Sequence, residues 1–204
     1  MDLIDISHVL DENTPVFPGD YKTSLSVYKT IDEDFYNSYL LQSCLHTGTH
    51  IDAPMHLISD DNSMVDFALE RFHGQGVLLD VRGERPIGMK SVCMEMIREQ
   101  DIVLLLTGCD KQWGKDAYFN EHPALSDELG RFLISRNIKM LGMDMPSPDH
   151  SPYTLHKELL EAGIFILENL TNLQSLIGVV SFDVMALPLK INAEASFVRA
   201  VCVC

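Results

Sequence analysis

Three histidines and one aspartate stand close together in the chain, and their spacing follows one rule. They are His46, His50, Asp52 and His56, and every interval between them is even. In an extended chain, side chains two residues apart point to the same face, whereas on a helix His50 and Asp52 would point roughly 200° apart. A glycine and a proline inside the segment also disfavour a helix. The spacing predicts an extended or partly looped segment that gathers imidazoles and a carboxylate, which are ligands for zinc or manganese.

Each of these residues also has an ordinary structural explanation when it is taken alone. A single histidine is more often hydrogen-bonded than metal-bound, and Asp52 precedes Ala53 and Pro54, where it could form a turn or a cap. The metal-site hypothesis therefore depends on the four side chains converging. The remaining histidines lack such a pattern and are expected on the surface or in the core; they are His8, His73, His122 and His150.

Around this segment, the hydrophobic pattern predicts alternating strands and helices. The run 102–106 is wholly apolar and lies between Asp101 and Gly108, which favours a strand buried on both faces. Segments 23–30 and 37–45 are β-like and are each expected to bury one face. The other expected strands cover residues 3–9, 76–81, 140–143, 164–167, 179–187 and 197–203, and the expected helices cover 66–71, 91–99, 126–136 and 155–162. The order predicts one mixed α/β domain over residues 1–204.

The composition narrows the classes of partner. The 204 residues hold 15 Lys and Arg against 30 Asp and Glu, a formal charge of −15. A surface this acidic repels nucleic acid and anionic membranes, so a small-molecule substrate is expected. No apolar run reaches the roughly 18 to 20 residues of a membrane helix, and the first residues do not resemble a signal peptide. Five cysteines without CxxC spacing indicate reduced thiols, and we expect a cytoplasmic protein.

The segment 46–56 reads HxGTHxDxPxH, and it resembles the signature of the cyclase-like metal-dependent hydrolase family. That family includes bacterial kynurenine formamidases and isatin hydrolases. The resemblance extends to Asp5-Ile6-Ser7, to the loop 14–20, to Leu106-Thr107-Gly108, and to His156 and Glu168. It implies a swivelling β/β/α domain with a mixed sheet and a homo-oligomer, either dimer or tetramer.

The resemblance also implies a set of ligands for two divalent ions, with zinc as the first expectation and manganese as the alternative. Carried over residue by residue, the ligands are His46, His50, Asp52, His156 and Glu168. The chemistry of these residues agrees, because carboxylates can bridge two ions that lie about 3.5 to 4 Å apart and share a hydroxide. Taken without the resemblance, the local sequence favours ordinary structural roles, a helix-entry histidine for His156 and a solvated strand-end glutamate for Glu168, because nothing local to either residue demands a metal.

The resemblance implies that His56 is the general acid/base of the reaction. A histidine suits proton transfer to a departing nitrogen near neutral pH, although a role as a further metal ligand is the competing interpretation. Phe17 stands where the kynurenine formamidases carry a tryptophan, and it is either a substrate contact or a loop-packing residue. The segment 147–149 could line the site or form a turn.

The expected reaction is hydrolysis of a C–N amide or formamide bond by a metal-bound hydroxide, with N-formylkynurenine as the leading substrate. A cyclic amide or lactam such as isatin is the alternative substrate. A non-catalytic metal-binding domain is a second hypothesis, but structural zinc sites are usually closed and rich in cysteine. A metal-assisted cyclase or dehydratase is a third.

Overall fold

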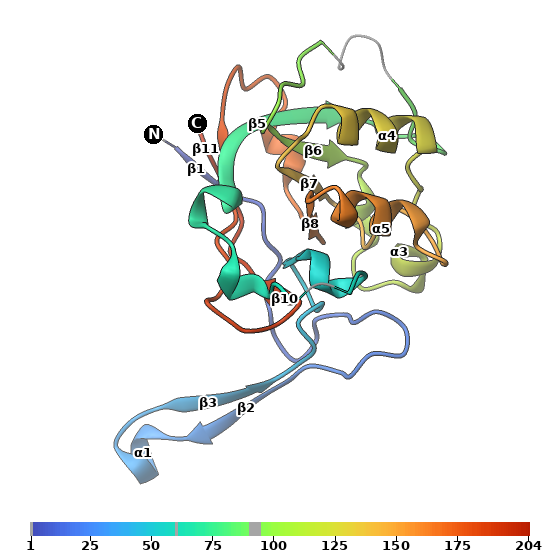
Figure 1. The fold of residues 1–204 in the computed structure, drawn as a ribbon. Helices are drawn as coiled ribbons and strands as arrows, with labels where there is room; N and C mark the ends of the chain where they lie inside the picture. Colours follow the sequence, from blue (N-terminus) through green and yellow to red (C-terminus); the bar gives the residue numbers. More distant parts are fainter. Residues whose placement is uncertain (1, 60, 90–94) are drawn as a thin grey trace.

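A large mixed sheet runs through the computed structural model, which describes residues 2–59, 61–89 and 95–204 (Figure 1). Its four middle strands, β5 to β8, are parallel neighbours, and the remaining neighbours pair antiparallel. In spatial order the strands are β1 (Leu3–Asp5), β11 (Val201–Val203), β9 (Asp183–Met185), β5 (His73–Asp80), β6 (Ile102–Leu106), β7 (Met140–Met143), β8 (Phe165–Glu168), β4 (His50–Asp52) and β10 (Ala195–Phe197). The mixed α/β fold predicted from the sequence is confirmed.

Helices cover one face of the parallel strands. The two longest are α4 (Asp127–Ser135) and α5 (Thr154–Glu161), and α3 (Asp116–Asn120) is shorter. The Ser126 side chain caps α4 by accepting a hydrogen bond from the Leu129 amide. The apolar residues of α4 and α5 pack against alternate side chains of β6 to β8, including Val103, Leu105 and Ile166.

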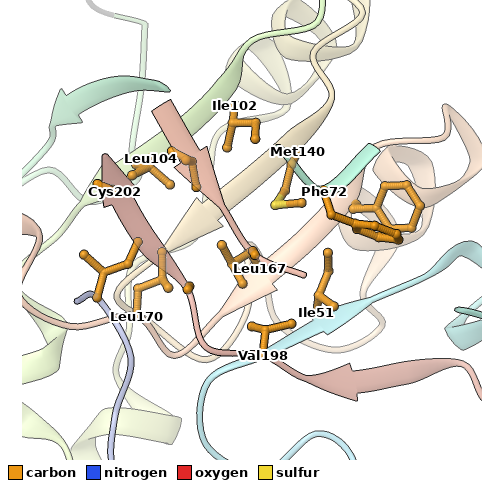
Figure 2. Close-up of a cluster of buried hydrophobic side chains, with 14 of the residues drawn as sticks. Ile51, Phe72, Ile102, Leu104, Met140, Leu167, Leu170, Val198 and Cys202 are labelled. Carbon is orange, nitrogen blue, oxygen red and sulfur yellow. The ribbon is translucent and has the colours of Figure 1, made fainter. Parts of the chain in front are cut away.

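The opposite face of the same strands forms a second core. Figure 2 shows Leu104, Met140 and Leu167 meeting Ile51 of β4 and Cys202 of β11. All five side chains are fully buried. The strand over 102–106 is buried along its whole length, as its apolar run predicts.

A β-hairpin projects away from this body, and we call residues 24–42 the arm (Figure 1). It consists of β2 (Ser24–Lys29), α1 (Ile31–Asp34) and β3 (Ser38–Gln42), and β2 and β3 form a separate two-stranded sheet. The two strands are confirmed, but in the single chain neither strand buries a face as expected. The exposed large apolar residues of the arm are Val27, Tyr28, Ile31, Phe35, Tyr36, Tyr39, Leu40 and Leu41.

Several other predicted elements differ in extent. The helix expected over 66–71 is two 3₁₀ turns, η2 (Met64–Asp66) and η3 (Leu69–Phe72). Of the helix expected over 91–99, residues 91–94 lie outside the described residues and 95–99 contain turns. The strand expected over 197–203 is divided between β10 and β11. Further 3₁₀ turns are η1 (Pro54–His56), η4 (Cys109–Gln112) and η5 (Leu173–Leu176).

Within the described residues, no helix combines the length and apolar character needed to cross a membrane.

Candidate metal centre

The predicted ligands meet where β4 lies beside the carboxyl end of β8. His50 and Asp52 point to one face of β4, and Ile51 between them points into the apolar core (Figure 2). Glu168, the last residue of β8, pairs directly opposite His50 in the antiparallel register. The alternation predicted for this segment is confirmed for the part that forms a strand.

Asp52 lies at the middle of the cluster. Its Oδ1 is 2.9 Å from His46 Nδ1 and 3.3 Å from His50 Nε2, and its Oδ2 is 3.4 Å from His156 Nε2. Glu168 Oε2 is 3.5 Å from His50 Nε2, and Glu168 Oε1 is 3.9 Å from His156 Nδ1. The structure thus brings together residues that are more than 100 positions apart in the sequence.

Two compact groups of candidate ligand atoms share Asp52. One comprises His46, Asp52 and His56, and the other comprises His50, Asp52 and Glu168; in each group the ligand atoms lie within 4.8 Å of one another. A carboxylate common to two groups is the arrangement that a bridging ligand between two ions requires.

The donor atoms of this cluster fit a cation. Among the described residues, the buried atoms that make no hydrogen bond include His50 Nε2, both oxygens of Asp52, His156 Nε2 and Glu168 Oε1. Buried polar atoms are normally satisfied, and unpaired buried charge is costly. Divalent ions that accept imidazole and carboxylate ligands would pair these atoms, in addition to the 2.9 Å contact between Asp52 Oδ1 and His46 Nδ1.

The electrostatics of these side chains point the same way. Burial disfavours the charged form of His46, but the carboxylate of Asp52 outweighs burial and raises the pKa of His46 to about 11. Burial, together with the charge of Asp52, raises the pKa of Glu168 well above its ordinary value. A divalent ion bound to these side chains would displace protons from them, because metal ligands must be deprotonated.

His56 lies at the edge of the cluster, at the end of η1. Its ring centroid is 4.2 Å from that of His46 and 5.6 Å from that of His156. Burial lowers the pKa of His56 to about 4, so the ring is neutral at pH 7. This position is compatible with both roles considered for His56, a proton-transfer group and a further ligand.

A hydrogen-bond chain that the sequence did not predict supports His50. Its Nδ1 lies 2.8 Å from the carbonyl oxygen of Gly48, so Nε2 is left facing Asp52 and Glu168. Asn169 Nδ2 also donates to Gly48 O at 2.9 Å, and the Tyr118 hydroxyl donates to Asn169 Oδ1 at 2.8 Å. Only the position of Asn169 directly after Glu168 could have drawn attention to this chain.

A cavity of about 290 Å³ opens onto the cluster. Aromatic side chains form part of its wall, and Phe17 contacts Phe119 edge to face with ring centroids 5.8 Å apart. Sequence analysis considered Phe17 as a substrate contact but did not identify Phe119 or Tyr153. The residues that line the cavity are Phe17, Asp20, His46, His56, Leu57, Phe119, Pro146, Ser147, Tyr153, His156, Glu168 and Asn169.

The segment 147–149 both lines the cavity and supports the start of α5. Ser147 lines the cavity, and its hydroxyl lies 3.4 Å from His156 Nδ1. Asp149 accepts a hydrogen bond from the Leu155 amide at 2.8 Å and a longer one, 3.4 Å, from the amide of His156. The loop therefore holds the first turn of α5, which carries His156.

Residues 4–150 match the model of a family described as "Putative cyclase", and the match covers more than half of the chain. The chain belongs to this cyclase family.

Curated members related to this cyclase-family chain are named kynurenine formamidases. The protein from Bacillus cereus is 33% identical over 97% of this chain and 95% of its own length. The protein from Geobacillus thermodenitrificans is 32% identical with the same coverage.

Solved structures similar to the cyclase-family chain include isatin hydrolases. Isatin hydrolase A from Labrenzia aggregata, bound to benzyl benzoate, superposes with a TM-score of 0.85 at 26% identity and covers 98% of this chain and 93% of its own. Isatin hydrolase A from Ralstonia solanacearum has a TM-score of 0.84 at 22% identity, with 98% and 91% covered, and supports the fold alone.

Proposed function

We propose that this protein is a metal-dependent hydrolase that cleaves a C–N bond of a small aromatic amide or formamide, with N-formylkynurenine as the first candidate substrate. The observation that carries the proposal is the pair of ligand groups sharing Asp52 at the wall of an aromatic-lined cavity. Full-length similarity to kynurenine formamidases supports the same reaction.

The proposed ligands are His46, His50, Asp52, His156 and Glu168. Two divalent ions held there supply Lewis acidity, which lowers the pKa of water and polarises a carbonyl group. We propose zinc first and manganese as the alternative, because histidine and carboxylate ligands accept both ions. The ligand side chains are mostly buried, so a bound carbonyl would sit where the effective dielectric constant is low.

His56 is the proposed general acid/base. It lies next to His46 and lines the cavity, so its ring can reach a substrate bound beside the ligands. Cleavage of a formamide requires a proton for the departing nitrogen, and a neutral imidazole can first accept a proton and then donate it. His56 is therefore assigned to proton transfer, with five other side chains left to hold the ions.

The cavity wall supports an aromatic substrate. Phe17 and Phe119 present rings that can contact a planar substrate by stacking or by an edge-to-face approach. An isatin-like lactam is the second candidate, because isatin hydrolase A has the same fold and binds benzyl benzoate, which is also aromatic.

We propose that the protein forms a homo-oligomer, a dimer or a tetramer, through the arm. A two-stranded hairpin is marginal on its own in water, and the exposed apolar residues of this arm are typical of an interaction surface. The cytoplasm is the proposed location, since the cysteines among the described residues are unpaired thiols. Light scattering on the purified protein, beside a Tyr39→Lys variant, tests the oligomer.

The decisive experiment follows hydrolysis of N-formylkynurenine by protein that has been stripped with a chelator and then restored with Zn²⁺ or Mn²⁺. The His56→Ala variant is assayed in parallel, and the bound metal is counted in both proteins. We expect metal-restored turnover in the wild type, and two bound ions without turnover in His56→Ala. Two ions with no turnover on this substrate would instead favour a lactam, and loss of metal from His56→Ala would make His56 a ligand.

A further inference from the structure

A second carboxylate, outside both ligand groups, lies against His46. Glu194 Oε1 is 3.3 Å from His46 Nε2, while the other ring nitrogen, Nδ1, lies 2.9 Å from Asp52. The His46 imidazole is therefore held between two carboxylates, one in the cluster and one at its rim. The Glu194 side chain is 39% exposed, whereas that of Asp52 is buried.

The backbone fixes Glu194 in this position. Glu194 directly precedes β10, and Ala195 of β10 pairs with Asp52 of β4. The Glu194 carbonyl oxygen also accepts a hydrogen bond from the Ala53 amide at 2.9 Å. The strand that carries Asp52 thus also anchors the residue that reaches His46.

We infer that Glu194 is a positioning residue that sets the tautomer and orientation of His46 for metal binding. A proton on Nε2, donated to Glu194, leaves the Nδ1 lone pair directed toward the ion. Histidine ligands commonly donate their second ring N–H to a carboxylate or carbonyl, which fixes the ring and raises its basicity. The inference rests on the proposed metal site and deepens it.

The two histidines of β4 and its preceding turn are supported differently. His50 directs its Nδ1 to a neutral acceptor, the Gly48 carbonyl, whereas His46 directs its Nε2 to a charged one. A charged partner makes the imidazole a stronger donor to a metal. The two ions are therefore not equivalent, and Glu194 acts on the ion of the His46 group alone.

The test measures zinc and manganese affinity by competition with a chelator in wild type, Glu194→Gln and Glu194→Ala. Glutamine keeps a neutral acceptor oxygen and alanine removes it. The control is Asp183→Asn, which removes the carboxylate of another histidine pair, His73 Nε2 to Asp183 Oδ2 at 3.7 Å, far along the sheet. Thermal melts of the ion-free proteins check that each variant folds.

We expect Glu194→Gln to lower the affinity for one ion by about 10- to 100-fold and Glu194→Ala to lower it further. The affinity for the second ion should stay within about threefold of wild type. At saturating metal, KM should be unchanged, because Glu194 does not line the cavity. The inference would be overturned if both ions lost affinity equally, or if Asp183→Asn lost as much affinity as the Glu194 variants. Wild-type affinities in both Glu194 variants would overturn it as well. Wild-type protein that binds no ions would instead overturn the proposed function, so the two failures are distinguishable.

Discussion

At the scale of single residues, Asp52 combines full burial with contact to three imidazoles. Burial disfavours its charge, but His46 and His50 outweigh burial and keep its pKa well below the ordinary value. Asp52 is therefore an anion inside the protein, and its two oxygens face different histidines. An ionised carboxylate of this kind is available to two cations at once.

Replacing Asp52 by Asn should remove this bridge. We expect bound metal to fall from two equivalents per chain to less than one, because both ligand groups include Asp52. The measurement is metal content by mass spectrometry after dialysis, with Asp127→Asn at an exposed helix position as the control. Metal content equal to that of wild type would exclude the bridging role.

Phe17 and Phe119 provide a second residue-scale prediction, on the substrate rather than the metal. An aromatic contact contributes about 0.5 to 1.5 kcal/mol, so Phe17→Ala should raise KM for N-formylkynurenine roughly 2- to 10-fold with little change in kcat. Steady-state kinetics test this, with formamide as a non-aromatic reference substrate. If KM for the aromatic substrate stays at the wild-type value, Phe17 only packs the loop.

At the scale of elements, residue spacing and apolar runs predicted the strands and the faces to which their side chains point. The even spacing of 46–56 placed His50 and Asp52 on one face of β4, and the apolar run 102–106 became a central strand. Periodicity does not encode partners that are distant in sequence. Sequence analysis therefore missed Glu194, which the pairing of β10 with β4 brings to the site, and Tyr118, which reaches Asn169 from helix α3.

The arm shows that a strand pattern also fails to predict which side chains are buried. The β-like patterns of 23–30 and 37–45 correctly predicted β2 and β3, but such patterns cannot specify what covers the apolar side chains of a strand. The predicted buried face is exposed in the single chain. Tertiary and quaternary contacts, rather than strand propensity, decide burial there.

Gly76 of β5 allows a prediction about sheet packing. A Cβ at this position would lie 2.1 Å from the ring of Phe182, and the ring is itself buried. Gly76→Ala should therefore lower the free energy of unfolding by about 1 to 3 kcal/mol, as overpacking does. The control is Gly88→Ala, where no atom of the described residues lies within 4 Å of the added carbon, apart from those of Gly88 and its two chain neighbours. Urea denaturation of both variants measures the difference, and equal stabilities would mean that Phe182 moves aside freely.

At the scale of the whole molecule, the charge and the arm oppose each other. Each chain carries a formal charge of −15, so two copies repel at long range. The arm offers apolar contacts whose strength does not depend on opposite charges. The association proposed through the arm should therefore be limited by electrostatic repulsion between the two chains.

This balance predicts that salt strengthens the oligomer. Raising NaCl from about 0.01 M to about 1 M shortens the Debye length from roughly 30 Å to roughly 3 Å, so the dissociation constant between chains should fall. Sedimentation equilibrium at several salt concentrations measures it, with Tyr39→Lys in the arm as the comparison. An oligomer that weakens with salt would indicate an interface built on ion pairs instead.

β4 also limits how this protein can change by insertion or deletion over evolutionary time. The strand spans three residues, with two proposed ligands on one face and Ile51 on the other. Side chains alternate with a period of two, so gain or loss of one residue there would turn both ligands into the apolar core and Ile51 toward the cavity. A one-residue change in β4 would therefore remove the proposed metal centre and disrupt the core together.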